Sequence, residues 1–208
     1  MTSRTNFKNT WLVEMPMGLN QPNMYETLIK YIRERIENGS TVIDLPNNLY
    51  KIQGRQVVYY WYEINHIIIL AIELRIESEG LVVNFISKNP NYKGKPPYAS
   101  DLYNAILDDN NRSIRIISDT QLIDEGYAIW KKLLKLGNKI SVYNKANPGQ
   151  TFTTLNTVED MDNFFKHDNR DYKQYQFVLS ESGEMLAETK SLFNTRRYRE
   201  LAGLDLED

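Results

Sequence analysis

The 208-residue sequence contains no cysteine and only two histidines, His66 and His167. The absence of cysteine excludes disulfides, zinc ribbons, iron–sulfur clusters and a thiol nucleophile from the chain itself. The two histidines are far apart in the sequence, and we expect no metal site from them. The chain also lacks the Gly-x-Ser-x-Gly motif of serine hydrolases.

Long apolar runs and a strong charge of one sign are also missing. No stretch reaches the roughly 18 apolar residues that a transmembrane helix requires. The 25 lysines and arginines nearly balance 27 aspartates and glutamates, and the net charge of −2 excludes a globally basic nucleic-acid-binding protein. Hydrophobic residues make up 41% of the chain, which is enough for a sizeable core. We therefore expect a folded, soluble, cytoplasmic protein without a membrane partner.

We expect one domain over residues 1–208, because no internal repeat, low-complexity tract or linker divides the sequence. Residues 1–22 form an N-terminal arm with scattered apolar positions. Residues 23–180 form the core, and residues 181–208 form a C-terminal helix and tail. The tail carries the basic cluster Arg196-Arg197-Tyr198-Arg199.

The first half of the core predicts one helix followed by antiparallel strands. From Asn23 the apolar residues recur at three- and four-residue steps, which indicates an amphipathic helix that ends near Asn38-Gly39. Strands are predicted at residues 41–45, 49–53, 57–63, 66–76 and 81–87. Residues 67–72 are apolar at every position, which places this strand in the middle of a sheet covered on both sides.

The second half alternates helices and strands. Helices are predicted at residues 98–107, 122–136, 158–165 and 184–198, and strands at residues 113–117, 139–143 and 175–179. Asp119 or Thr120 is the expected cap of the helix at 122–136. The whole pattern predicts an α+β fold with a mixed, mainly antiparallel central sheet flanked by helices on both faces.

A glycine-containing loop joins the strand at 81–87 to the helix that begins near Ala99. It reads Ile86-Ser87-Lys88-Asn89-Pro90-Asn91-Tyr92-Lys93-Gly94-Lys95. This loop and the order of elements resemble the GNAT acetyltransferase family over about residues 23–180. In that family the loop and the following helix hold the pyrophosphate of acetyl-coenzyme A through backbone N–H groups. The resemblance implies that acetyl-coenzyme A is bound by Ser87, Lys93, Gly94, Lys95, Ala99 and Ser100.

The resemblance also implies an active site between two diverging strands that end near Ser87 and Ser118. An amine acceptor would enter there, with Glu73 as the general base and Ser118 at the strand-to-helix turn. Tyr127 would be the general acid, because the position that aligns with the family's tyrosine holds Trp130.

Each of these residues also has a purely structural interpretation. Glu73 would then be a strand-end carboxylate paired with Arg75 or Arg55. Residues 118–119 would be a helix cap, and residues 93–95 a solvated turn whose lysines bind nothing.

Three functions therefore stay open. The first is an N-acetyltransferase that acts on an unknown amine acceptor. The alternative is a catalytically inactive binding or accessory module of the same fold, with a protein or nucleic-acid partner, for example in a phage or mobile element. Pro96-Pro97 favours the alternative, since each proline removes an N–H donor from the loop. For nucleic acid the candidate contacts are the aromatic run 57–62 and the basic tail, neither of which is favoured. The third is an unrelated α+β fold with an accidental loop match.

Overall fold

The structure is a computed structural model that describes residues 22–120, 122–145, 153–165 and 174–180. Its helices are α1 (Pro22–Glu37), α2 (Ala99–Asp109), α3 (Asp124–Lys135) and α4 (Val158–Asp162). Its strands are β1 (Val42–Leu45), β2 (Leu49–Gln53), β3 (Val57–Ile64), β4 (Ile67–Glu77), β5 (Gly80–Lys88), β6 (Ile116–Ile117), β7 (Ile140–Asn144), β8 (Thr153–Leu155) and β9 (Tyr175–Leu179). The expected arm before residue 22, His167, the helix at 184–198 and the basic tail lie outside the described residues.

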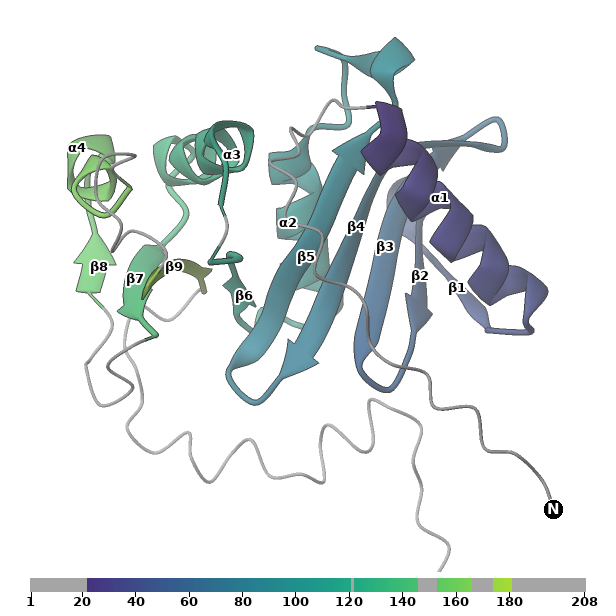
Figure 1. Cartoon of the computed structure of the whole chain (residues 1–208), viewed down its shortest axis with the longest axis horizontal. Coiled ribbons are helices and arrows are strands. Elements are labelled where there is room, and N and C mark those ends of the chain that lie inside the picture. The colour runs from purple at the N-terminus through teal and green to yellow at the C-terminus, as the bar shows by residue number, and fades with distance from the viewer. Residues whose placement is uncertain (1–21, 121, 146–152, 166–173, 181–208) are drawn as a thin grey trace, which may run out of the picture.

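All nine strands belong to one sheet, in the order β1-β2-β3-β4-β5-β6-β9-β7-β8 (Figure 1). Within the described ranges the neighbouring strands are antiparallel except β5 and β6, which are parallel. The last strand, β9, lies between β6 and β7. The expected α+β class with a mixed, mainly antiparallel sheet is therefore confirmed.

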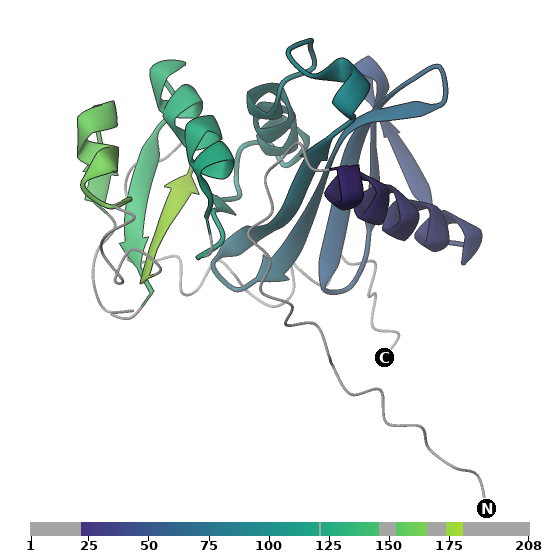
Figure 2. The same cartoon turned by 45° about the horizontal axis from the view of Figure 1, so that its top comes forward.

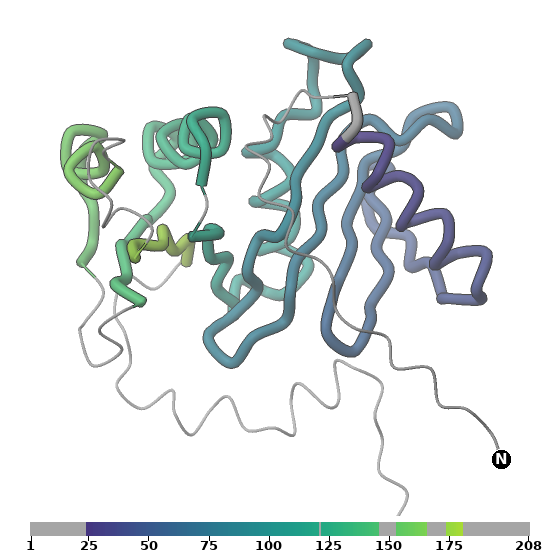
Figure 3. Tube along the Cα trace, viewed as in Figure 1, coloured from purple at the N-terminus to yellow at the C-terminus, as the bar shows by residue number. Residues whose placement is uncertain are grey.

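Helices cover both faces of the sheet because the strands β2 to β5 alternate apolar side chains between two sides. Helix α1 crosses one face, as the backbone trace in Figure 3 shows. Leu28 and Ile32 pack there against Tyr59, Trp61 and Ala71. Residues of α2, α3 and α4 pack together in the core on the other face. The turned view in Figure 2 shows α1 in front of the strands and α2 behind them. We call these two sides the α1 face and the α2 face. The central strand β4 is buried on both, as its unbroken apolar run predicts.

The structure and the prediction differ at β6, at β8 and at the start of α3. Strand β6 contains only Ile116 and Ile117, so it is shorter than the strand predicted at 113–117. Strand β8 is absent from the prediction. Helix α3 begins at Asp124 after Ile123 as N-cap, so the prediction that Asp119 or Thr120 caps it is wrong. The Asp119 carboxylate instead accepts the N–H of Thr120 at 2.6 Å.

We expect β4 to carry much of the stability. Ile72 is fully buried in the core, whereas Ile67 in the same strand is 45% exposed. Replacing Ile72 by alanine leaves a cavity and should lower the free energy of unfolding by about 2–5 kcal/mol. The control Ile67→Ala should cost less than about 1 kcal/mol. Urea unfolding of both variants measures the difference, and equal losses would contradict the central position of β4.

Candidate functional site

The parallel strands β5 and β6 stay together only briefly. Their pairing consists of Leu81 with Ile116 and Val82 with Ile117. Strand β5 then continues to Lys88, whereas the chain leaves β6 and turns toward β9. Beyond Val82, no described strand pairs with the edge of β5 that faces away from β4. Such an edge presents backbone N–H and C=O groups that can hydrogen-bond an extended ligand.

Ser118 fixes the point at which the chain leaves β5. Its backbone N–H donates to the carbonyl oxygen of Phe177 at 2.8 Å, and its Oγ accepts the N–H of Phe177 at 2.9 Å. Its carbonyl oxygen accepts a third hydrogen bond from Nε2 of Gln176 at 2.7 Å. The residue is buried, so these bonds anchor β6 to β9. They assign Ser118 an architectural role at the divergence of the strands.

Glu73 is a buried carboxylate in β4, 6% exposed and directed to the α1 face. It accepts hydrogen bonds from the Asn84 side-chain amide and from the Tyr59 hydroxyl. Burial, followed by the charge and hydrogen bond of Glu73, raises the pKa of Tyr59, so this phenol stays protonated and donates. Arg75 pairs with Glu77 at 3.3 Å. The expected alternative, a pairing of Glu73 with Arg75 or Arg55, is therefore wrong.

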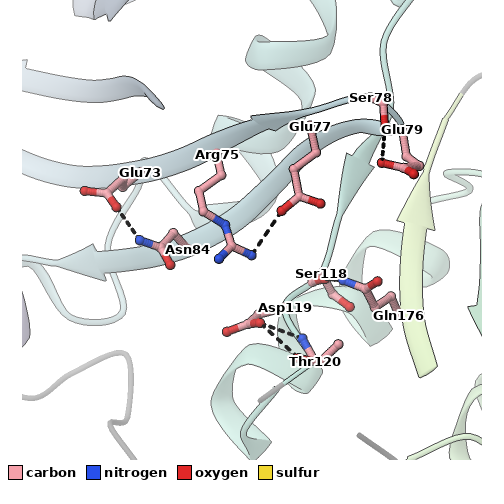
Figure 4. Close-up of polar contacts among 10 residues, drawn as sticks. All are labelled: Glu73, Arg75, Glu77, Ser78, Glu79, Asn84, Ser118, Asp119, Thr120 and Gln176. Atoms are coloured by element: carbon pink, nitrogen blue, oxygen red, sulfur yellow. Dashed lines mark hydrogen bonds and ion pairs between the residues drawn. The ribbon is translucent and has the colours of Figure 1, made fainter. Parts of the chain in front are cut away.

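Asn84 reaches Glu73 because of a β-bulge. Leu74 pairs with Val83 and Glu73 with Phe85, which leaves Asn84 as the extra residue of β5. The bulge comes two residues after Val82, where the pairing with β6 ends. The Glu73–Asn84 pair therefore lies beside the divergence of β5 and β6 (Figure 4). Asn84 is not among the predicted site residues, although an amide inside an apolar strand is a signal.

Tyr127 and Glu73 lie on opposite faces of the sheet. Tyr127 belongs to the core on the α2 face, where its ring stacks on Phe165 with centroids 4.0 Å apart. Its hydroxyl donates to Oδ1 of Asp162 at 2.7 Å, a bond that ties α3 to α4. Burial, with the hydrogen bond and charge of Asp162, raises the pKa of Tyr127. The structure therefore does not bring the expected acid and base to one cleft. Trp130 is core as well.

The Lys88 side chain links the end of β5 to the loop that follows it through two hydrogen bonds. Its Nζ donates to the carbonyl oxygens of Lys95 and, at 2.7 Å, of Pro97. Burial lowers the pKa of Lys88. Asn89 holds the loop's other end, since its side chain accepts the N–H of Asn91 at 3.0 Å. The loop thus has a fixed shape made by its own contacts.

An acidic side chain already occupies the start of helix α2. The carboxylate of Asp101 accepts the N–H of Tyr98 at 2.7 Å, and Pro96-Pro97 has no N–H to offer. A carboxylate in this position satisfies the helix end and its dipole as a phosphate would. The first-turn donors without an acceptor inside the helix are the backbone N–H groups of Ala99 and Ser100.

The remaining predicted cofactor residues differ in their accessibility. Lys93 and Lys95 are exposed, and Gly94 has a φ of +75°, a conformation that favours glycine. Ser87 is fully buried in β5, so its hydroxyl is covered. The Ser100 hydroxyl is also buried, and it has no hydrogen-bond partner within the described residues.

Lys132 adds a positive charge that the sequence analysis did not assign to this region. Its Nζ lies 4.0 Å from the ring centroid of Tyr98, and Nζ of Lys88 lies 5.1 Å from the same centroid. The helix that carries Lys132, α3, is remote in sequence from the loop, so only the tertiary fold brings the two together. The start of α2 is therefore surrounded by lysines although Asp101 sits on it.

Tyr127→Phe should weaken the fold, because it removes the bond between α3 and α4. The hydrogen bond from Tyr127, with help from Lys131, holds the pKa of Asp162 below its usual range. We expect a loss of about 1 kcal/mol at neutral pH. A depressed carboxylate pKa stabilises the fold above about pH 4 and ceases to do so as the group protonates.

The difference between wild type and Tyr127→Phe should therefore shrink as the pH falls below 4. Denaturant titrations at several pH values measure it, with Tyr31→Phe as a control phenol on α1. A loss of stability that does not change with pH would show that the Tyr127 hydroxyl does not lower the pKa of Asp162.

Comparison with protein-family models, with curated proteins and with solved structures finds no match. None of the helices in the described ranges is long and apolar enough to cross a membrane. The same residues contain no group of three or more histidines, aspartates or glutamates arranged around a metal position. The interpretation of the site therefore depends on its own geometry.

Proposed function

We propose that this chain is an acyl-coenzyme A-dependent N-acetyltransferase that acts where β5 and β6 diverge. One observation carries the proposal: a parallel strand pair splits after two residue pairs, next to a buried carboxylate held by two hydrogen-bond donors. The order of elements around the split is also the order that the resemblance to the GNAT family implies.

In this proposal the thioester extends along the open edge of β5. The amide groups of coenzyme A would form hydrogen bonds with the N–H and C=O groups of β5, as a neighbouring strand does. The acceptor amine approaches from the α1 face, because Glu73 lies there. Amine attack on the thioester carbonyl carbon forms the C–N bond and breaks the C–S bond. The nitrogen loses a proton, which Glu73 is available to accept directly or through water, and coenzyme A leaves as a thiolate that takes a proton from water. Asn84 and Tyr59 orient that carboxylate. Tyr127 takes no part, since it lies on the other face.

A pyrophosphate can bind at the start of α2 only if the Asp101 carboxylate moves away from the N–H of Tyr98. A phosphate oxygen at the N–H of Tyr98 would have to displace the carboxylate that occupies this donor. Lys93, Lys95 and Lys132 supply compensating positive charge nearby. Affinity for a phosphorylated ligand should therefore be limited by Asp101 and supported by these lysines.

A second candidate is a binding module of the same fold without catalytic activity. Two features of the loop favour it. The hydrogen bonds of Lys88 hold the loop in place without a ligand, and Pro96-Pro97 has no N–H groups to donate to one. In this case the partner is a protein or nucleic acid, and acetyl-coenzyme A has no site.

Binding of acetyl-coenzyme A separates the two candidates. The acetyltransferase proposal expects thermal stabilisation, with about 2.7 kcal/mol added at a hundred times the dissociation constant. Asp101→Asn should tighten binding severalfold, because it removes a negative charge from the site. Lys93→Ala combined with Lys95→Ala should weaken it, while Lys135→Ala, an exposed lysine near the end of α3, should not. No stabilisation of wild type or Asp101→Asn would favour the binding module.

Glu73→Gln tests the base. It keeps the size and one acceptor of the side chain but removes its basicity, so transfer should fall about 10²–10⁴-fold. Release of free coenzyme A thiol with a panel of amines measures transfer, and calorimetry should show unchanged cofactor affinity. Glu77→Gln, four residues along β4 and more exposed, serves as the matched control. Equal activity of the two variants would remove Glu73 from the mechanism.

A further inference from the structure

A pocket lies on the α2 face, at the end of the sheet opposite the loop that follows β5. It encloses about 130 Å³ between β1, β2, β3, the end of β4, the start of β5 and the chain after α2. A single water needs only about 10–15 Å³ of such a volume, so there is room for a molecule of several heavy atoms. The pocket shares no lining residue with the candidate active site.

One wall of the pocket is a closed polar network. Nζ of Lys51 and the hydroxyl of Tyr60 both donate to Oδ2 of Asp109 at 2.7 Å. Asn110 extends the network through Nδ2, which donates to the Tyr60 hydroxyl at 3.2 Å. The ion pair is largely buried, with 16% of the Lys51 side chain and 12% of the Asp109 side chain exposed. The charge of Lys51 is therefore neutralised, and this wall is rigid.

Arg55 supplies the one charge at the pocket that is not balanced. It lies in the turn between β2 and β3, is exposed, and forms no ion pair with any residue that the structure describes. A guanidinium matches a carboxylate with two parallel hydrogen bonds, and it repels an amine. The pocket therefore selects for a single negative charge at its rim.

Four lining residues, Val58, Ile76, Leu81 and Ile114, are apolar, and we call them the floor of the pocket. Val58, Leu81 and Ile114 are buried in the core on the α2 face, and Ile76 packs against that core. A phosphate dianion would leave charge uncompensated over this floor, since only one cation is unpaired. A short hydrocarbon chain gains from contact with it.

We propose that this pocket binds a short aliphatic monocarboxylate, with the carboxylate on Arg55 and the hydrocarbon body on Val58, Ile76, Leu81 and Ile114. The site is independent of the acyl-transfer proposal, because it lies at the opposite end and on the other face of the sheet. The protein would thus have a second ligand, a small organic acid.

The test is a titration of the full chain with 4-methylpentanoate and with the neutral isostere 4-methylpentanamide, followed by amide NMR shifts. The acid should bind at least about tenfold more tightly than the amide, as expected for a charge-assisted pair. Shifts should concentrate on residues 51–58, 76–81 and 110–114, and leave residues 88–101 unchanged.

Two variants and one control complete the test. Arg55→Gln should abolish the preference for the acid over the amide, and Ile76→Phe should fill the pocket and weaken both probes. Arg33→Gln, an exposed arginine on α1, should leave binding of the acid within twofold of wild type. Thermal unfolding checks that each variant is folded. Absence of binding at millimolar acid, equal binding of acid and amide, or an unaltered preference in Arg55→Gln would each overturn the proposal.

Discussion

The two-residue strand β6 holds the two parts of the sheet together. It pairs with β5 on one side and with β9 on the other, and Ile116 and Ile117 are both buried. Every other pairing lies either within β1 to β5 or among β7, β8 and β9. Because β6 is so short, the strands on its two sides share a sheet at one end and separate at the other. The hydrogen bonds of Ser118 to β9 set the residue at which this separation begins.

The alternation of side chains along β3 and β4 divides the polar groups between the two faces. Glu73 and Tyr59 lie on the α1 face, whereas Tyr60, one residue along, joins Asp109 on the α2 face. Glu73 and Asp109 thus each have a tyrosine donor, and the two pairs lie on opposite faces of the sheet. The sheet separates them, so the two networks can serve different ligands without sharing a proton.

Much of the fold was predictable from the sequence because its strongest signals are local. The apolar run at 67–72 predicts a strand buried on both faces, and the limits of β2 and β9 agree with the predicted ones. Strand β8 was missed because Thr153 and Thr154 are exposed and give no apolar alternation. The predicted strand was longer than β6 because the apolar residue Ile114 precedes it, and Ile114 belongs to the segment between α2 and β6.

The site was less predictable, because it depends on contacts between distant segments. Counting alternate residues along β4 gives the face of Glu73 within its own strand. That face is covered by α1, and no pattern within the sequence of β4 indicates where α1 packs. The contact with Asn84 requires a bulge, and the capture of Tyr98 by Asp101 requires the exact start of α2. These features come from tertiary packing and single backbone bonds, so periodicity does not reveal them.

The loop after β5 shows why a motif alone does not establish a binding site. A glycine loop before a helix binds phosphate when its donors are free, since the ligand then replaces only water. Here Asp101 and Lys88 already satisfy the donor of Tyr98 and the carbonyl groups of Lys95 and Pro97. A phosphate that binds the N–H of Tyr98 would replace its hydrogen bond to Asp101 by a similar one. Any net gain in binding free energy must therefore come from the lysines around the loop. Affinity at this loop is therefore governed by the balance between one carboxylate and its neighbouring ammonium groups.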